Sequence, residues 1–285
     1  MRRVPIYVLG QSAGGREMEE EARVGRRWED ALANLINSDK RFAASFSACV
    51  RERLGLAISG DIRAQRDQGV KADIHIFDSS GRAVGLSLKA RGQTGRPDDH
   101  LDRRWLDDWR EALNMPSPVY EAFWRGIMRK AVDGRASLVL EEDRPLVRDF
   151  LLSNLDAFLE EAFRRGEREL QLFAVIEHEG EATLYVFRMD DVIGFVREDV
   201  RETGIEFAKV IRLGRFLWVQ RKAGDSREID KRLPKTDPRH PGNQLQVKIL
   251  PIPLKNEAVK RLKHCEFKLP LNHARMGGRR LNEFL

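Results

Sequence analysis

The chain has 285 residues, of which 41% are hydrophobic and 34% charged, and its formal net charge is +6 at pH 7. This composition excludes global disorder, and the length allows one large domain or two ordinary ones. No apolar run approaches the ~18 residues that span a bilayer, and Cys49 and Cys265 match no paired metal spacing, so we expect a cytoplasmic protein without a disulfide scaffold or zinc ribbon.

The first half of the chain combines helices with a hairpin. We expect a short strand at residues 6–9, a helix carrying Trp28 and Leu32 on one apolar stripe, and a second helix over residues 41–54. Alternating apolar residues then predict strands over 70–77 and 83–89, joined by the turn signal Asp-Ser-Ser-Gly. Residues 91–165 are predicted to be mostly helical, most clearly at 147–163.

The second half is rich in predicted strands, at residues 170–178, 183–188, 207–211, 216–221 and 244–250. We therefore predict an α/β fold with a central mixed sheet flanked by helices and a β-rich C-terminal part. The division would be residues 1–165 and 166–285, or one continuous domain.

Positive charge is concentrated in the C-terminal part of the chain. Residues 209–285 hold 19 Lys or Arg and 7 Asp or Glu, a net of +12, which leaves −6 for residues 1–208. Such asymmetry favours a surface that faces a polyanion, although a solvated basic face is a common alternative.

The predicted hairpin places polar side chains on one face. Asp73 projects opposite the apolar residues of the first strand, and Ser87 and Lys89 project opposite those of the second. If the two strands pair, Asp73 and Lys89 lie close together. A carboxylate that binds Mg²⁺ and a lysine that stabilises charge on a phosphate suit metal-assisted hydrolysis of a phosphodiester.

The segments Val70-Lys71-Ala72-Asp73-Ile74-His75-Ile76 and Val84-Gly85-Leu86-Ser87-Leu88-Lys89 resemble the PD-(D/E)XK nuclease superfamily, and more closely its type II restriction endonucleases. The resemblance implies a restriction-endonuclease-like core in which Asp73, Lys89, Glu29 and Ser87 form the catalytic site. It implies that Asp73 and Glu29 bind Mg²⁺, with the carbonyl of Leu88 as a further ligand.

Ser87 stands where the family usually has its second acid. The resemblance offers two replacements, Glu29 on the first long helix or an acid from the downstream run Asp98, Asp99, Asp102, Asp107, Asp108 and Glu111. We prefer Glu29, because Arg103 occupies the position where the most similar subgroup has its downstream Glu. The departure at Ser87 also leaves a catalytically inactive relative open.

A polar segment near the C-terminus is the predicted DNA contact. Arg239, Asn243, Gln244, Gln246 and Lys248 surround the start of the last predicted strand, and amide and guanidinium groups can read adenine and guanine. A polar turn between two core strands is the alternative reading.

The resemblance therefore implies a Mg²⁺-dependent type II endonuclease that cuts double-stranded DNA at a specific sequence and leaves 5′-phosphate and 3′-hydroxyl ends. It also implies a homodimer, since two sites related by a two-fold axis suit a palindromic duplex. A structure-selective repair or recombination nuclease of the same fold and an inactive DNA-binding protein are the alternatives.

Overall fold

A computed structural model describes residues 13–58, 60–66, 70–90, 99–177, 181–223 and 233–270, with side chains from residue 26 onward. Within these ranges, no helix is both long and apolar enough to cross a membrane. The helices are α1 (Ala13–Ser38), α2 (Lys40–Glu52), α3 (Leu106–Ala112), α4 (Ser117–Val132), α5 (Arg144–Ser153), α6 (Leu155–Arg164), α7 (Met189–Thr203) and α8 (Pro251–Arg261), with a 3-10 turn η2 (Pro241–Asn243).

A six-stranded mixed sheet forms the centre of the molecule. Its order is β1 (Arg63–Arg66), β2 (Ile74–Phe77), β3 (Ala83–Ala90), β5 (Leu170–Glu177), β6 (Thr183–Arg188) and β11 (His264–Lys268). The β3–β5 pair is parallel and the other pairs are antiparallel. The predicted hairpin is confirmed, because β2 and β3 pair with Ile74 opposite Leu86.

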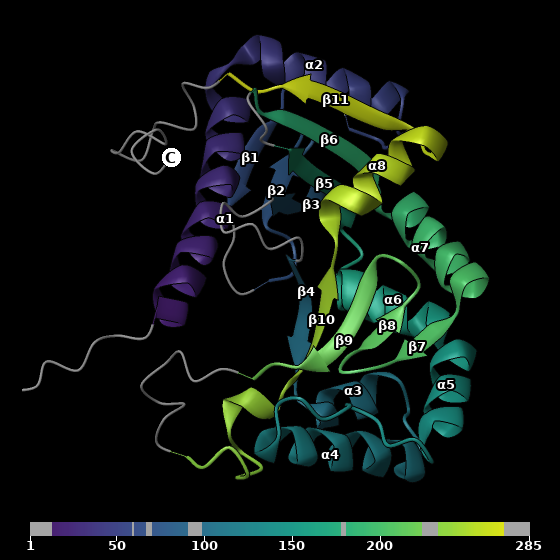
Figure 1. The fold of residues 1–285 in the computed structure, drawn as a ribbon. Coiled ribbons are helices and arrows are strands. Elements are labelled where there is room, and N and C mark those ends of the chain that lie inside the picture. The colour runs from purple at the N-terminus through teal and green to yellow at the C-terminus, as the bar shows by residue number, and fades with distance from the viewer. Residues whose placement is uncertain are drawn as a thin grey trace, which may run out of the picture.

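A second, five-stranded antiparallel sheet lies beside the first (Figure 1). Its order is β4 (Asp99–Arg104), β10 (Leu245–Ile249), β9 (Leu217–Arg221), β8 (Ile211–Leu213) and β7 (Ile205–Phe207). A β-bulge interrupts the pairing of β4 with β10 between Val247 and Lys248.

Two hydrophobic clusters hold these layers together. One cluster packs α1 and α2 against one face of the six-stranded sheet, through residues such as Leu32, Phe46 and Leu86. The larger cluster joins the other face to α3–α8 and to the inner face of the five-stranded sheet. The prediction of a mixed sheet flanked by helices is confirmed. Each sheet takes strands from both sides of residue 165, so the predicted division does not coincide with the sheets.

Several local predictions need correction. Residues 99–104 form β4 rather than part of a helical stretch, and residues 63–66 form β1, a strand that the sequence did not predict. The predicted strand at 207–211 is not continuous: Phe207 ends β7, Ile211 begins β8, and residues 208–210 form the turn between them, which closes with a hydrogen bond from the Ala208 N–H to the Val210 carbonyl. The strand expected at residues 6–9 lies outside the described residues.

The two cysteines form a disulfide between α2 and β11. Cys49 lies on α2 and Cys265 on β11, and 216 residues separate them in the sequence. The expectation that excluded a disulfide scaffold rested on this wide spacing. The structure contains one long-range cross-link instead, and it lies against the cluster that holds α2 on the six-stranded sheet.

Candidate functional site

Asp73 is held in a fixed position immediately before β2. Its N–H donates to the Leu86 carbonyl at 3.0 Å, which extends the hairpin ladder by one residue. Its side-chain Oδ2 accepts hydrogen bonds from the Leu88 N–H at 2.7 Å and the Ser87 hydroxyl at 3.2 Å. The same oxygen lies 4.0 Å from Lys89 Nζ. The sequence prediction that Asp73 and Lys89 lie close together is therefore confirmed.

The sequence of β3 explains this geometry. Leu86 and Leu88 belong to the cluster beneath α1 and α2, so the alternation of the strand turns Ser87 and Lys89 to the other face. Gly85 lets the start of β5 pack closely against β3, because a Cβ at this position would lie only 3.0 Å from Leu170 Cα. Lys89 is buried, with its side chain 11% exposed.

Lys89 remains an ammonium group in this environment. Burial disfavours its charged form, but the carboxylates of Asp73, Asp99 and Glu29 outweigh burial and raise the pKa of Lys89. These groups come from three separate parts of the chain: the hairpin, β4 and α1. Asp73, Lys89, Glu29 and Asp99 together are called the carboxylate–lysine cluster below.

Glu29 reaches this cluster from α1. Its side chain is 17% exposed and accepts a hydrogen bond from Arg66 Nε at 2.8 Å. Burial raises the pKa of Glu29, the negative charge of Asp73 raises it further, and Arg66 and Lys89 act in the opposite direction. The structure therefore brings Glu29 within electrostatic reach of Asp73, but its carboxylate is bound to Arg66.

Asp99 is the member of the downstream acidic run that joins the cluster. It is the first residue of β4. Burial raises the pKa of Asp99, as does the charge of Asp73, whereas Lys89 lowers it. Asp102 is instead paired with Arg104, and Asp98 lies outside the described residues. Glu29 and Asp99, one from each of the two sources that the sequence offered for a second carboxylate, therefore both interact electrostatically with Asp73 and Lys89.

Other acids of that run have structural partners. Asp107 accepts a hydrogen bond from the Tyr120 hydroxyl at 2.8 Å, and Asp108 caps α3 through the Trp105 N–H at 3.1 Å.

The sequence analysis missed Lys71, which joins the two sheets. Its ammonium group donates to the carbonyl of Leu101 on β4 and lies 4.0 Å from Asp102 Oδ1. Burial is the main cause that lowers the pKa of Lys71, to about 8. Its position two residues before Asp73, on the same face of the predicted strand over 70–77, was the available signal. Through its hydrogen bond to Leu101, Lys71 connects the segment that contains Asp73 to β4, the strand that contains Asp99.

We expect Arg66→Gln to raise the pKa of Glu29. Arg66 lowers this pKa through its charge and its hydrogen bond, so its removal leaves burial and Asp73 less opposed. Carboxyl NMR titration of Glu29 measures the change, and any activity that needs ionised Glu29 should shift its acid limb to higher pH. Asp30→Asn is the control, because Asp30 bonds the same Arg66 and its side chain is 54% exposed. An unchanged pKa in Arg66→Gln would contradict the assignment.

The donor set suits a hard divalent cation that keeps water and phosphate ligands. Among the described residues, no three His, Cys, Asp or Glu groups lie close enough together to hold a metal ion. Mg²⁺ commonly binds through one or two carboxylates together with phosphates and waters. Asp73 with Glu29 or Asp99 meets that requirement, and the main chain of Leu88 lies beside Asp73.

The residues predicted to contact DNA occupy a turn and strand β10. Asn243 is 1% exposed. Its side-chain amide donates hydrogen bonds to the carbonyls of Lys235 and Asp237. Its side-chain oxygen accepts a hydrogen bond from Arg221 Nε. This geometry favours the alternative reading, in which Asn243 holds a polar turn, and argues against contact with a base.

The other predicted contacts divide between that turn and the strand. Arg239 is exposed and pairs with Asp237 at 2.9 Å, and the carbonyl of Gln244 accepts from the Lys222 N–H. Gln246 is 2% exposed and accepts from Gln220 Nε2 at 3.1 Å. Lys248 acts electrostatically on Asp99, which links β10 to the carboxylate–lysine cluster.

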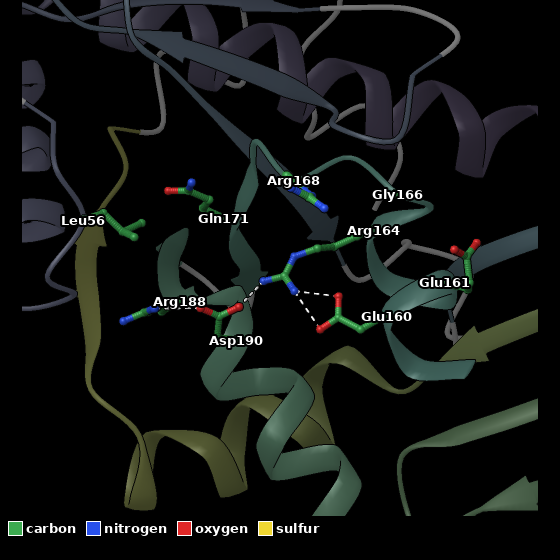
Figure 2. Close-up of a pocket in the computed structure, with 9 residues that line it drawn as sticks. All are labelled: Leu56, Glu160, Glu161, Arg164, Gly166, Arg168, Gln171, Arg188 and Asp190. Atoms are coloured by element: carbon green, nitrogen blue, oxygen red, sulfur yellow. Dashed lines mark hydrogen bonds and ion pairs between the residues drawn. The ribbon is translucent and has the colours of Figure 1, made fainter. Parts of the chain in front are cut away.

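A charged pocket of about 410 Å³ lies elsewhere, around the end of α6 and the start of β5 (Figure 2). Arg164 pairs with Glu160 and Asp190, and Arg188 pairs with Asp190 at 2.7 Å. Its three arginines and three acidic residues balance in charge. The pocket contains none of the cluster residues, and its ion pairs hold α6, β6 and α7 together.

Comparison with known proteins supports the fold. No protein-family model matches the chain, and no curated protein matches it in sequence. Among solved structures, it is similar to the restriction endonuclease MspI in complex with its cognate DNA, with a TM-score of 0.51 and 14% sequence identity over 80% of this chain and 90% of that one. The chain therefore has a restriction-endonuclease-like fold.

Proposed function

We propose that the chain is a Mg²⁺-dependent endonuclease that hydrolyses phosphodiester bonds of double-stranded DNA at a specific sequence. The observation that carries the proposal is the contact of Asp73 with Lys89 across a β-hairpin, 4.0 Å apart, beside the carboxylates of Glu29 and Asp99. The restriction-endonuclease-like fold supports it. The family resemblance adds that cleavage leaves 5′-phosphate and 3′-hydroxyl ends.

Each residue of the cluster has a distinct role in this proposal. Asp73 and either Glu29 or Asp99 would hold Mg²⁺, with the Leu88 carbonyl as a further ligand. When bound, Mg²⁺ would polarise the scissile phosphate and orient water near it. Lys89 keeps its proton because the carboxylates raise its pKa, so its ammonium group stabilises negative charge that develops on the phosphate oxygens. Ser87 orients Asp73 through its hydroxyl.

The second acid of the family, which Ser87 replaces in this chain, is not required in this arrangement. Glu29 and Asp99 both act electrostatically on Asp73 or Lys89, so the cluster holds three carboxylates without an acid at position 87. This favours an active nuclease over the inactive DNA-binding alternative.

A homodimer belongs to the same proposal, because two copies related by a two-fold axis present two cutting sites to a palindromic duplex. Sedimentation velocity measures it directly.

Digestion of unmodified plasmid DNA tests the proposal. Discrete fragments in Mg²⁺ and none in EDTA are expected of a sequence-specific endonuclease. Smearing, or cleavage of branched DNA alone, would favour a repair or recombination nuclease. DNA binding without cleavage in Mg²⁺ or Mn²⁺ would favour an inactive protein.

A further inference from the structure

The outward side of the five-stranded sheet gathers polar and basic side chains from four parts of the sequence. On β10, Leu245, Val247 and Ile249 enter the hydrophobic core, so Gln246 and Lys248 face the other way. The strand register places further residues on that side. The outer face consists of His100, Arg103, Glu206, Arg212, Trp218, Gln220, Gln246 and Lys248.

Cross-strand pairing orders this face into two rows. Gln246 lies between Arg103 on β4 and Gln220 on β9, and the Gln220–Gln246 hydrogen bond confirms that their side chains share one side. Lys248 lies between His100 and Trp218. Each row therefore combines a cationic side chain with hydrogen-bonding or aromatic groups.

The charge of the outer face is mainly positive. Arg103, Lys248 and Arg212 are cations, and Glu206, the one carboxylate in the set, pairs with Arg212 at 3.2 Å on the far strands. His100, Arg103 and Arg212 are exposed, and Trp218, Gln220 and Lys248 are half-buried. Cationic side chains on this sheet face complement the phosphates of a polyanion, and the amides between them can form hydrogen bonds with the edges of its bases.

The outer face begins at the carboxylate–lysine cluster. Asp99 is the first residue of β4, and His100 and Arg103 follow it on the same strand. Arg103 pairs with Gln246 and Asp99 pairs with Ile249, three residues apart on β10. At about 3.3 Å per residue, Arg103 therefore lies about 10 Å along the strand from Asp99, which is the length of about three base pairs. Lys248 also lies close enough to lower the pKa of Asp99, whose net shift is upward through burial.

We propose that this outer face is where duplex DNA lies next to the cutting site, with Arg103 and Lys248 as its principal cationic contacts and Gln220 facing the base edges. The proposal rests on the proposed nuclease function and moves the main DNA contact from the turn around Asn243 to the face of β4, β10 and β9. Gln246, the buried residue between Arg103 and Gln220, orients Gln220 through their hydrogen bond.

DNA binding in EDTA tests this proposal without cleavage. Fluorescence anisotropy with a fluorescein-labelled duplex would be measured over a range of salt concentrations for the whole chain. The double variant Arg103→Gln/Lys248→Gln should bind more weakly, by roughly fivefold or more, and its log–log salt slope should fall by about 1 for each phosphate that the protein no longer neutralises. Arg103→Gln alone, at an exposed position, should give about half of the slope change.

The matched control is Lys40→Gln/Arg53→Gln, which removes two exposed cations around α2 and should leave affinity and slope unchanged. If both double variants bind like the wild type while the wild type cuts DNA, the outer face is not the contact surface and the nuclease proposal stands. If the wild type neither binds nor cuts duplex DNA, both proposals fail. An equal loss in both double variants would reflect overall charge and would overturn the assignment to this face.

Discussion

Asp73→Asn and Lys89→Met should each reduce DNA cleavage by about 10²–10³-fold or more, because each removes a charge that the proposed function places beside the reacting phosphate. Asp73 Oδ2 is held by the Leu88 N–H and the Ser87 hydroxyl, and Lys89 is held against it at 4.0 Å. Single-turnover cleavage of a labelled duplex at saturating enzyme measures the chemical step apart from binding.

The two variants must be shown to fold, since removing one partner of a buried ion pair can cost about 3–5 kcal/mol. Far-ultraviolet circular dichroism and DNA binding in EDTA provide that check. Asp30→Asn is the control for loss of an acid, because Asp30 follows Glu29 on α1 and contacts the same Arg66. It should retain wild-type cleavage. Near-normal cutting by Lys89→Met would remove the cluster from consideration as the active site.

Ser87→Ala is expected to have a much smaller effect, because it removes one 3.2 Å hydrogen bond to Asp73 and leaves the shorter bond from the Leu88 N–H. A net contribution of about 0.5–1.5 kcal/mol per hydrogen bond corresponds to roughly a tenfold loss of cleavage or less.

Comparing Glu29→Gln with Asp99→Asn in calorimetric titrations of Mg²⁺ shows which of the two carboxylates binds Mg²⁺ together with Asp73.

The hairpin could be predicted from sequence because its signals are local. Alternation of apolar and polar residues, a turn signal of four residues and a short loop fix which side chains share a face. The contact of Asp73 with Lys89 follows from these rules alone. Glu29 depended on the family resemblance, since nothing in the pattern of α1 indicates which sheet residue it approaches.

The role of β4 could not be predicted in the same way. Its sequence, Asp-His-Leu-Asp-Arg-Arg, has no β-branched residue, and its strand conformation comes from pairing with β10, more than 140 residues later. Local propensity is overridden when such long-range pairing buries the backbone. For the same reason the sequence could not single out Asp99 within the downstream acidic run, and the positions of Lys71 and Arg66 beside acids are visible only in the folded chain.

The disulfide between α2 and β11 is also a consequence of topology, because β11 is the sixth strand of the sheet that α2 covers. Reducing the disulfide should lower the free energy of unfolding by about 2–5 kcal/mol, since a cross-link that closes a long loop restricts the unfolded chain more than one that closes a short loop. A midpoint of thermal unfolding lower by about 5–15 °C is the expected result. Thiol titration in denaturant without reductant should detect no free cysteine in the wild-type chain.

The matched control separates the cross-link from the packing of the two side chains. Cys49→Ser/Cys265→Ser loses the disulfide permanently, so reductant should not change its unfolding midpoint further. The carboxylate–lysine cluster is built on α1, β3 and β4, whereas the disulfide joins α2 to the edge strand β11. Cleavage by the folded, reduced protein at moderate temperature should therefore match that of the oxidised protein. An unfolding midpoint that does not respond to reductant would show that α2 is held on β11 by the surrounding apolar contacts, such as the stacking of Phe46 on Phe267, rather than by the cross-link.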